Sequence, residues 1–368
     1  MQIQTDFDGG NVLVDRIDGD HVYFQPDLRD TDRPWFYWYF AVQNAAGRTL
    51  TFHPTVENIL TNHAPAMSVD GGKNWQWLDP QCVSQDDVFT VTIADNANDY
   101  RLSMGMPYVK AQLDAFAPLH HDQLRISTLC QSPKGIAIPL WQMGPTLEQA
   151  TYRVMFSARH HCCEMMASYV LEGLLEAAMT DPWWQEHVHV TAVPFVDIDG
   201  VAAGDQGKSR KPRDHNRDYD DKPIYPSTPV MMALVKEHCA IGLDILMDLH
   251  CPWIRHPCNE AIYMAHVGGE PFASNQARFS QCLESSITGT LPYVAADDIP
   301  FGTEWNTEQN YGNGCGFSKW AATQTGVSLS TTLEVPYATV RDKIIDQQNA
   351  RQFGQEMALA IRNYLKNQ

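Results

Sequence analysis

The sequence predicts a mixed α/β protein in which a sheet flanked by helices follows an all-β region. Over residues 1–106, short β-branched and aromatic runs are separated by Gly, Asp, Asn and Pro clusters, as between the strands of a sandwich. From residue 107 onward, strand-like runs alternate with helical ones, the pattern of a mostly parallel or mixed sheet covered by helices. The length of 368 residues suits about two domains. We therefore expect an N-terminal β-sandwich domain at 1–106 and a second domain at 107–368.

Five segments of the first region have the composition of strands. Residues 35–42, Trp-Phe-Tyr-Trp-Tyr-Phe-Ala-Val, are the most aromatic of them. Aromatic residues fill sandwich cores more often than they form carbohydrate-binding faces, so a core strand is the preferred interpretation. The predicted strands are 11–14, 21–24, 35–42, 50–53 and 88–93.

The second region alternates apolar runs of strand length with longer segments of helical character. Strands are predicted at 124–130, 136–141, 152–156, 189–196, 244–249, 262–265 and 328–335. Helices are predicted at 164–179, 231–239, 272–286 and 341–366. The segment 204–221, rich in Lys, Arg and Asp, is predicted to be a loop.

The composition excludes several classes of protein. With 26 Lys plus Arg against 44 Asp plus Glu, the formal charge is −18, which disfavours nucleic acid and anionic lipid as partners. No apolar run is long enough to span a membrane. The first residues lack the basic and apolar segments of a signal peptide, and the nine cysteines have no disulfide-scaffold spacing. We expect a cytoplasmic protein with reduced thiols; the composition leaves the oligomeric state open.

Two polar residues lie at the start of a predicted helix. His161 and Glu164 are three residues apart, which puts both side chains on one face. An imidazole nitrogen and a carboxylate on one face form a two-point grip on zinc, with room for one more ligand and a water. The same pair also fits an ordinary helix start with a favourable acid in its first turn.

Two further candidates end predicted strands. His250 follows the run 244–249, and Glu334 lies near the end of the strand 328–335. Sites open at the carboxyl edge of such strands, which makes His250 a third candidate ligand. A carboxylate beside a metal-activated water can take its proton and deliver it to a leaving amine, the role that we expect for Glu334. Each residue alone is also typical of an ordinary strand end.

A basic segment at 209–217, Ser-Arg-Lys-Pro-Arg-Asp-His-Asn-Arg, stands out in this acidic chain. Arginine forks bind carboxylates at two points, and a neighbouring amide adds a donor. Asn216 and Arg217 are therefore candidates for carboxylate binding. A solvated loop that neutralises nearby acids would have the same composition.

In this order, the motifs resemble those of the M14 zinc metallocarboxypeptidases, in particular the cytosolic carboxypeptidase branch. The first motif of that branch, Ala-Arg-x-His-x-x-Glu, is matched at 158–164, and its Asp-x-Asn-Arg motif at 214–217. The third ligand falls in Asp-Leu-His at 248–250, and a Thr-Leu-Glu motif lies at 332–334. The resemblance implies a mixed sheet of the eight-stranded, carboxypeptidase-like type, flanked by helices and preceded by an all-β sandwich.

The resemblance also covers the front of the chain, with Trp-Phe-Tyr at 35–37 and Pro-Tyr at 107–108. Two stretches depart from the branch. Cys162 and Cys163 replace a Pro-Gly pair, and Asp-Ile at 197–198 replaces the Asn-Pro of an Asn-Pro-Asp-Gly-Val stretch.

The resemblance implies a role for each matched residue. One zinc ion would be held by His161, Glu164 and His250. Asp214 would orient His161, Asn216 and Arg217 would hold the α-carboxylate of the substrate's last residue, and Glu334 would activate the water. A further arginine polarises the scissile carbonyl in this family; Arg210 is the first choice and Arg213 the competitor. Tyr311 is a candidate for the tyrosine that some members place near the substrate.

The implied activity is hydrolysis of the C-terminal residue of peptides or proteins. The cytosolic branch tends to remove acidic residues, using a basic residue shortly before the Thr-Leu-Glu strand. Lys319 lies 15 residues before Glu334 and would fill that role, unless it is a surface lysine. Two alternatives remain open: an N-acyl amino acid amidohydrolase of the aspartoacylase type, and a catalytically inactive binding protein.

Overall fold

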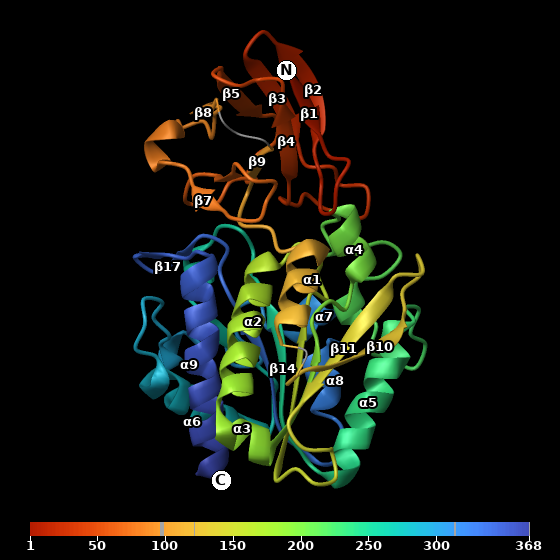
Figure 1. Ribbon diagram of the computed structural model, residues 1–368. Coiled ribbons are helices and arrows are strands. Elements are labelled where there is room, and N and C mark those ends of the chain that lie inside the picture. Colours follow the sequence, from red (N-terminus) through yellow and green to blue (C-terminus); the bar gives the residue numbers. More distant parts are fainter. Residues whose placement is uncertain (96–98, 121, 313, 368) are drawn as a thin grey trace.

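A seven-stranded mixed sheet forms the centre of the second region (Figure 1). The computed structural model describes residues 1–95, 99–120, 122–312 and 314–367. In spatial order the strands are β10 (Arg125–Gln131), β11 (Ala137–Met143), β13 (Val188–Val193), β12 (Tyr152–Ala158), β14 (Leu243–His250), β16 (Val327–Glu334) and β15 (Tyr263–His266). The four strands from β13 to β16 in this order run parallel, and the outer strands join them antiparallel. The resemblance implied eight strands, and the described residues provide seven.

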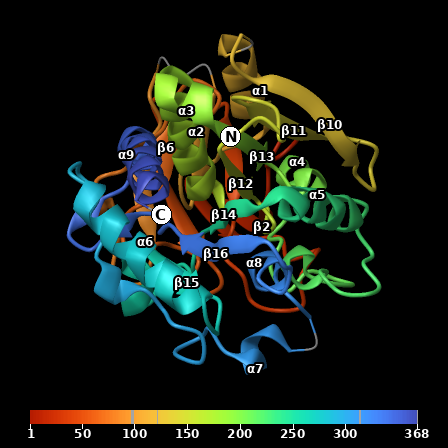
Figure 2. The same ribbon diagram turned by 90° about the horizontal axis from the view of Figure 1, so that it is seen from below.

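Helices cover both faces of this sheet (Figure 2). On one face lie α2 (Met165–Thr180), α6 (Phe272–Ser286) and α9 (Gln347–Lys366); on the other lie α5 (Ser227–Ile241) and α8 (Phe317–Ala321). Parallel strands covered on both faces are buried, as β14 and β16 almost fully are. The longest apolar run in β14 lies at 245–247, whereas β16 has serine and threonine between its apolar residues. The predicted α/β class is confirmed. Shorter helices complete the region: α1 (Lys110–Leu119), α3 (Pro182–His187), α4 (Ile198–Ala203) and α7 (Glu308–Tyr311).

The first region consists of two β-sheets. The five-stranded sheet has the order β1 (Gln2–Gln4), β4 (Tyr39–Gln43), β9 (Tyr100–Ser103), β6 (Ala66–Ser68) and β7 (Gln76–Trp77). The four-stranded sheet has the order β2 (Leu13–Asp18), β3 (His21–Gln25), β5 (Thr49–Pro54) and β8 (Phe89–Thr92). Aromatic side chains fill the space between them: the Phe24 ring of one sheet lies 5.6 Å from Phe40 of the other, centroid to centroid. Figure 1 shows this region above the end of the large sheet.

The aromatic run 35–42 contributes both to the core of the first region and to the contact with the second region. Its strand begins only at Tyr39, and Phe40 is buried in the core, as the interpretation as a core strand requires. Trp35 and Phe36 precede the strand and pack against Trp253 of the second region, with the Trp35 and Trp253 rings 4.5 Å apart, edge to face. The first two residues of the run therefore join the two regions.

Most predicted elements are present, with two instructive differences. The helix expected from residue 341 begins at Gln347, because a hairpin of β17 (Thr339–Val340) and β18 (Lys343–Ile344) precedes it and Asp346 caps its first turn. Helix α1 was not predicted; Pro118 inside it obscures its pattern.

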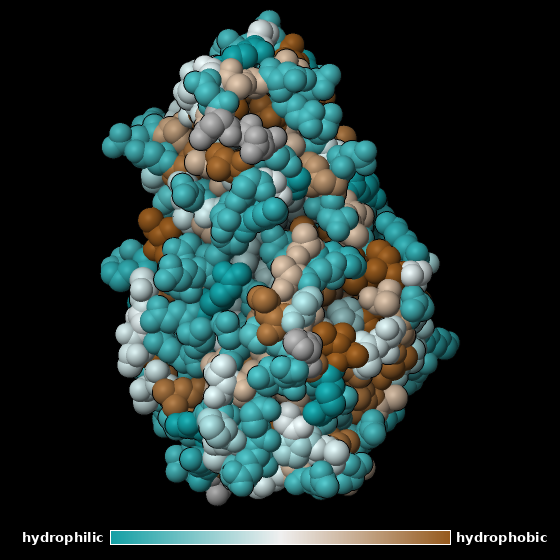
Figure 3. Space-filling model, in the orientation of Figure 1, coloured by the Kyte–Doolittle hydropathy of each residue, from teal (hydrophilic) through white to brown (hydrophobic). Residues whose placement is uncertain are grey.

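The surface agrees with the acidic composition. Hydrophilic residues cover most of the face in Figure 3, and hydrophobic ones lie in separate areas, most of them right of centre. Within the described ranges, none of the helices has the length and hydropathy that a bilayer crossing requires. All nine cysteines are free thiols, as expected.

Helices α2 and α9 cross at two glycines. A Cβ atom on Gly354 would lie 2.0 Å from the carbonyl oxygen of Val170, and one on Gly173 would lie 2.0 Å from that of Arg351. Neither backbone can move without shifting a whole helix. This crossing anchors α2, whose N-terminus lies at the candidate site.

We expect Gly354→Ala to lower the free energy of unfolding by about 1–3 kcal/mol, because overpacking outweighs the better helix propensity of alanine. Denaturant unfolding measures the change. Leu359→Ala, at an exposed position of the same helix, is the control and should change stability by less than about 0.5 kcal/mol. Equal stabilities of the Gly354→Ala and Leu359→Ala variants would contradict a tight crossing.

Candidate metal centre and cavity

The sheet brings the candidate residues to one edge. Strands β12, β14 and β16 are neighbours and parallel, so their carboxyl ends meet at the same edge. His250 and Glu334 are direct partners at the ends of β14 and β16. His161 and Glu164 follow the end of β12, and Glu164 is the residue that precedes the first turn of α2. All four side chains are buried.

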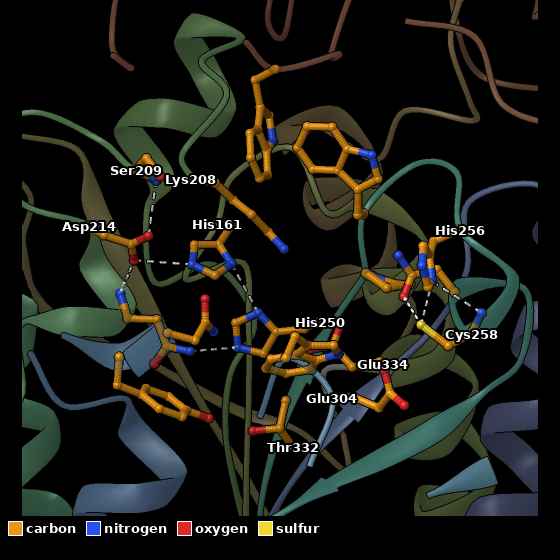
Figure 4. Close-up of a pocket in the computed structure, with 18 of the residues that line it drawn as sticks. His161, Lys208, Ser209, Asp214, His250, His256, Cys258, Glu304, Thr332 and Glu334 are labelled. Carbon is orange, nitrogen blue, oxygen red and sulfur yellow. Dashed lines mark hydrogen bonds and ion pairs between the residues drawn. The ribbon is translucent and has the colours of Figure 1, made fainter. Parts of the chain in front are cut away.

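The side chains of His161, Glu164 and His250 converge on one point, and Figure 4 shows the two histidines facing each other. Nδ1 of His161 lies 2.9 Å from Oε1 of Glu164, and Nδ1 of His250 lies 2.6 Å from Oε2 of the same carboxylate. The two Nδ1 atoms are 3.2 Å apart. Ligand atoms of a tetrahedral zinc site, with bonds of 2.0–2.1 Å, are separated by about 3.3 Å. The donor set and its spacing therefore fit a zinc ion.

Each histidine is oriented by a carboxylate behind it. Nε2 of His161 lies 3.1 Å from Oδ1 of Asp214, and Nε2 of His250 lies 2.6 Å from Oδ2 of Asp248. Burial by itself would lower the pKa of His250, but the carboxylates of Asp248 and Glu164 outweigh it and raise that pKa well above its usual value. With Nε2 turned toward the carboxylates, both rings present Nδ1 to Glu164.

A second group of three, formed by His160, Asp248 and His250, has ligand atoms close enough to hold a metal ion. These atoms already satisfy one another: Asp248 lies 2.8 Å from Nδ1 of His160 and accepts a hydrogen bond from the Ser157 hydroxyl. Nε2 of His160 contacts the Tyr219 hydroxyl at 2.7 Å. His160 and Asp248 are fully buried and do not line the cavity described next. This group supports His250 from behind.

A cavity of about 510 Å³ opens beside His161 and His250. Glu334 lines it, and among the described residues its Oε2 has no hydrogen-bond partner although it is buried. Burial raises the pKa of Glu334, and the nearby Glu164 carboxylate raises it further. His250 and Lys208 lower this pKa, but only in part. A buried carboxylate with a raised pKa and a free oxygen is suited to take up a proton.

The predicted carboxylate-binding pair lies in the same cavity. Asn216 and Arg217 line it, and the Arg217 guanidinium lies over the ring of Tyr311, 4.7 Å from its centroid. Nη1 of Arg217 donates to the backbone oxygen of Asn216 at 2.8 Å. Within the described ranges, no carboxylate forms an ion pair with Arg217, which leaves the rest of its guanidinium available to a ligand. Burial raises the pKa of Tyr311 to about 12, so its hydroxyl is neutral at physiological pH.

The two arginines predicted to polarise a carbonyl lie elsewhere. Arg210 is mostly buried and pairs with Asp205 at 2.6 Å and Asp197 at 3.1 Å. Arg213 pairs with Asp218 at 2.9 Å. Neither lines the cavity. Both guanidiniums are paired with acids of the chain, and neither reaches the lining of the cavity.

Lys319 is also outside the cavity lining. Its ammonium lies 2.8 Å from Oε1 of Glu308 and 4.9 Å from the centroid of the Tyr311 ring. Tyr311 itself lines the cavity. The lysine expected to select an acidic side chain is therefore paired with an acid of its own.

Sequence reasoning missed three residues. Lys208 reaches the candidate metal centre, with Nζ 2.7 Å from Oε1 of Glu164, and Figure 4 shows its side chain pointing toward the two histidines. Burial would lower the pKa of Lys208, but Glu164 and Glu334 raise it, so the ammonium stays charged. Trp35, from the first region, also lines the cavity. The third residue, Asp248, could have been found from its place two residues before His250, since alternate strand residues share a face.

The sequence and the fold were compared with those of known proteins. No family model matches the sequence. A curated uncharacterized protein of Zymomonas mobilis is 23% identical over 275 residues, which is 68% of this chain and 67% of that protein. A metallo-carboxypeptidase from Burkholderia cenocepacia has a TM-score of 0.78 at 20% identity, covering 100% of this chain and 99% of that one.

A metallo-carboxypeptidase from Pseudomonas aeruginosa, solved in complex with (2-guanidinoethylmercapto)succinic acid, has a TM-score of 0.77 at 19% identity, over 100% of this chain and 99% of that one. Carboxypeptidase A of Helicoverpa armigera matches 70% of this chain and 71% of its own, with a TM-score of 0.52 at 15% identity. The chain therefore has, over its full length, the fold of the bacterial metallo-carboxypeptidases.

Proposed function

We propose that this protein is a zinc-dependent metallocarboxypeptidase that removes the C-terminal residue of peptides or proteins. The observation that carries the proposal is one cavity with three features. It is lined by the two histidines of a two-histidine, one-glutamate donor set, by a buried carboxylate with a free oxygen, and by an Asn-Arg pair. The fold shared with metallo-carboxypeptidases supports the same conclusion.

The donor set favours zinc over harder cations. Two imidazoles and one carboxylate, with a fourth position open to the cavity, are the usual protein ligands of catalytic zinc, whereas magnesium and calcium prefer oxygen. The ligands would be His161, Glu164 and His250. Zinc bound there would supply a lowered water pKa and a polarised carbonyl.

The residues of the chain would divide the remaining work. Arg217 and Asn216 bind the terminal α-carboxylate, which places the last peptide bond next to Glu334. Glu334 takes a proton from the attacking water and later delivers it to the departing amine nitrogen. Because Arg217 requires a free carboxylate, this arrangement selects the end of a chain over internal bonds.

The terminal side chain is a separate question from the terminal carboxylate. An acidic preference requires a cation with no acid of its own where that side chain binds. Lys319 does not meet this requirement, because Glu308 already pairs with it. We therefore expect no acidic preference to arise from Lys319.

Metal affinity tests whether Asp214 orients a metal-binding His161. We expect Asp214→Asn to weaken zinc binding by about 10–100-fold, because the amide no longer fixes the tautomer of His161. Competition with a chromophoric zinc chelator measures the affinity. Asp221→Asn, an exposed change in the same segment, should leave it unaltered. Equal affinities of the two variants would place the metal away from His161.

Peptide hydrolysis tests whether Glu334 carries the proton. We expect Glu334→Gln to lower hydrolysis of a peptide with a free C-terminus by about 10²–10⁴-fold, with zinc content unchanged. Glu237→Gln, on the exposed face of α5, is the matched control. Full activity of Glu334→Gln would refute the assignment of Glu334.

The same assay separates the competing functions. The unaltered enzyme should cleave the free peptide, spare its C-terminal amide, and lose activity with a zinc chelator. Faster hydrolysis of an N-acyl amino acid than of the peptide would identify an amidohydrolase. No hydrolysis of either would leave a binding protein.

The preference for the terminal residue tests whether Lys319 selects an acidic side chain. We expect Lys319→Met to leave the ratio of kcat/KM for peptides ending in Glu and in Leu unchanged, because Glu308 already neutralises the lysine. A selective loss of cleavage after the change, restricted to Glu-terminated peptides, would restore Lys319 to the pocket.

A further inference from the structure

One cation of the cavity stands beside the candidate metal ligands. Nζ of Lys208 lies 2.7 Å from Oε1 of Glu164 and donates a hydrogen bond to the backbone oxygen of Cys251, 3.2 Å away. Cys251 directly follows His250. Only 17% of the Lys208 side chain is exposed, and its ammonium lies 5.6 Å from the centroid of the Trp35 ring. The ammonium is thus held from several sides.

The other cations near the cavity are placed for different work. Arg217 lies beside Asn216 and over Tyr311, where a terminal carboxylate would bind. Arg33 lines the cavity with an exposed side chain. Arg210 and Arg213 are outside the lining. Among the described residues, Lys208 is therefore the cation of the cavity in contact with a candidate metal ligand.

The backbone that carries Lys208 is fixed by the first region of the chain. The Asp30 carboxylate accepts hydrogen bonds from the backbone N–H groups of Gln206 and Gly207. Gly207 has a φ of +79°, and a Cβ atom there would lie 2.5 Å from the backbone nitrogen of Cys162. The segment therefore packs directly against the residue that follows His161. Such close support gives Lys208 a defined position.

Hydrolysis of a peptide bond places negative charge on the carbonyl oxygen in the transition state. When water adds to the carbonyl carbon, the π electrons of the C=O bond move to oxygen, which becomes negative. When the C–N bond breaks, that electron pair re-forms the C=O bond, and the amine nitrogen receives the proton held by Glu334. A fixed cation at the oxygen stabilises the charge where it develops.

We propose that Lys208 stabilises the negative oxygen of the scissile carbonyl, the task that sequence reasoning gave to Arg210. The inference rests on the proposed peptidase function. The Glu164 carboxylate pairs with Lys208 and is also a proposed metal ligand. A metal ion bound to Glu164 would take the place of the Lys208 ammonium on that carboxylate. The ammonium would then be left to the Cys251 carbonyl and the cavity.

The test compares Lys208→Met with Lys208→Arg in the zinc-loaded chain. We expect Lys208→Met to lower kcat by about 10²–10³-fold with KM nearly unchanged. By calorimetry, a phosphonate analogue of the substrate, which carries an anionic tetrahedral group at the scissile position, should bind more weakly by a comparable factor. The released amino acid, which lacks that group, should bind as before. Lys208→Arg keeps the charge and should recover part of both losses.

Lys211→Met is the matched control, because it removes the same charge from an exposed position three residues away. Unchanged kcat and phosphonate affinity in Lys208→Met would overturn the role of Lys208 while the peptidase proposal stands. Equal weakening of phosphonate and amino acid would also overturn it, as a general disturbance of the site. No peptide hydrolysis by the unaltered chain would overturn both proposals. If Lys208→Met does not fold, Lys208→Gln gives the same comparison.

Discussion

A fully buried carboxylate is the constraint on which the site depends. The Glu164 side chain has no exposed surface, and an ionised carboxylate in such a place is costly unless positive groups surround it. Burial by itself would raise its pKa, but Lys208, His161 and His250 together hold that pKa well below its usual range. These partners come from the segment after β12, the end of β14 and a loop. The fold has to bring two distant segments, the end of β14 and the loop with Lys208, to the segment that carries this carboxylate.

Two kinds of support hold these segments. The sheet fixes His250 and Glu334, because the hydrogen bonds between β14 and β16 pair those two positions directly. The loop that carries Lys208 has no sheet beneath it and depends on the first region instead. The Gln206 side chain both accepts from and donates to the backbone of Tyr37, at 2.8 Å each. The all-β region therefore belongs to the architecture of the site and is more than an appended module.

Residues at the ends of regular elements could be predicted from the sequence, and the motif at 214–217 from the family resemblance, whereas Lys208, on the loop before that motif, could not. His250 and Glu334 end strands, and His161 and Glu164 lie between the end of β12 and the start of α2, so the local pattern places all four at one sheet edge. Arg210 was the first choice for the carbonyl-polarising cation because it precedes the Asn216–Arg217 pair in the same loop. Its partners Asp197 and Asp205 come from around α4, and Asp30 comes from the first region. No local pattern reveals that these acids meet, so contact across the fold decided which cation reaches the cavity.

The chemistry of the two cations suits this division between Arg217 and Lys208. A guanidinium is a planar fork that matches the two oxygens of a carboxylate, whereas an ammonium is a compact point charge that suits a single oxygen. A terminal carboxylate presents two oxygens, and a developing tetrahedral centre presents one. The lysine also has a flexible stem, and here the Cys251 carbonyl and the Trp35 ring restrict its ammonium. A lysine proposed to act beside the reacting carbon therefore depends on Trp35, which the first region contributes. In this way the β-sheets at the front of the chain take part in the proposed chemistry of the second region.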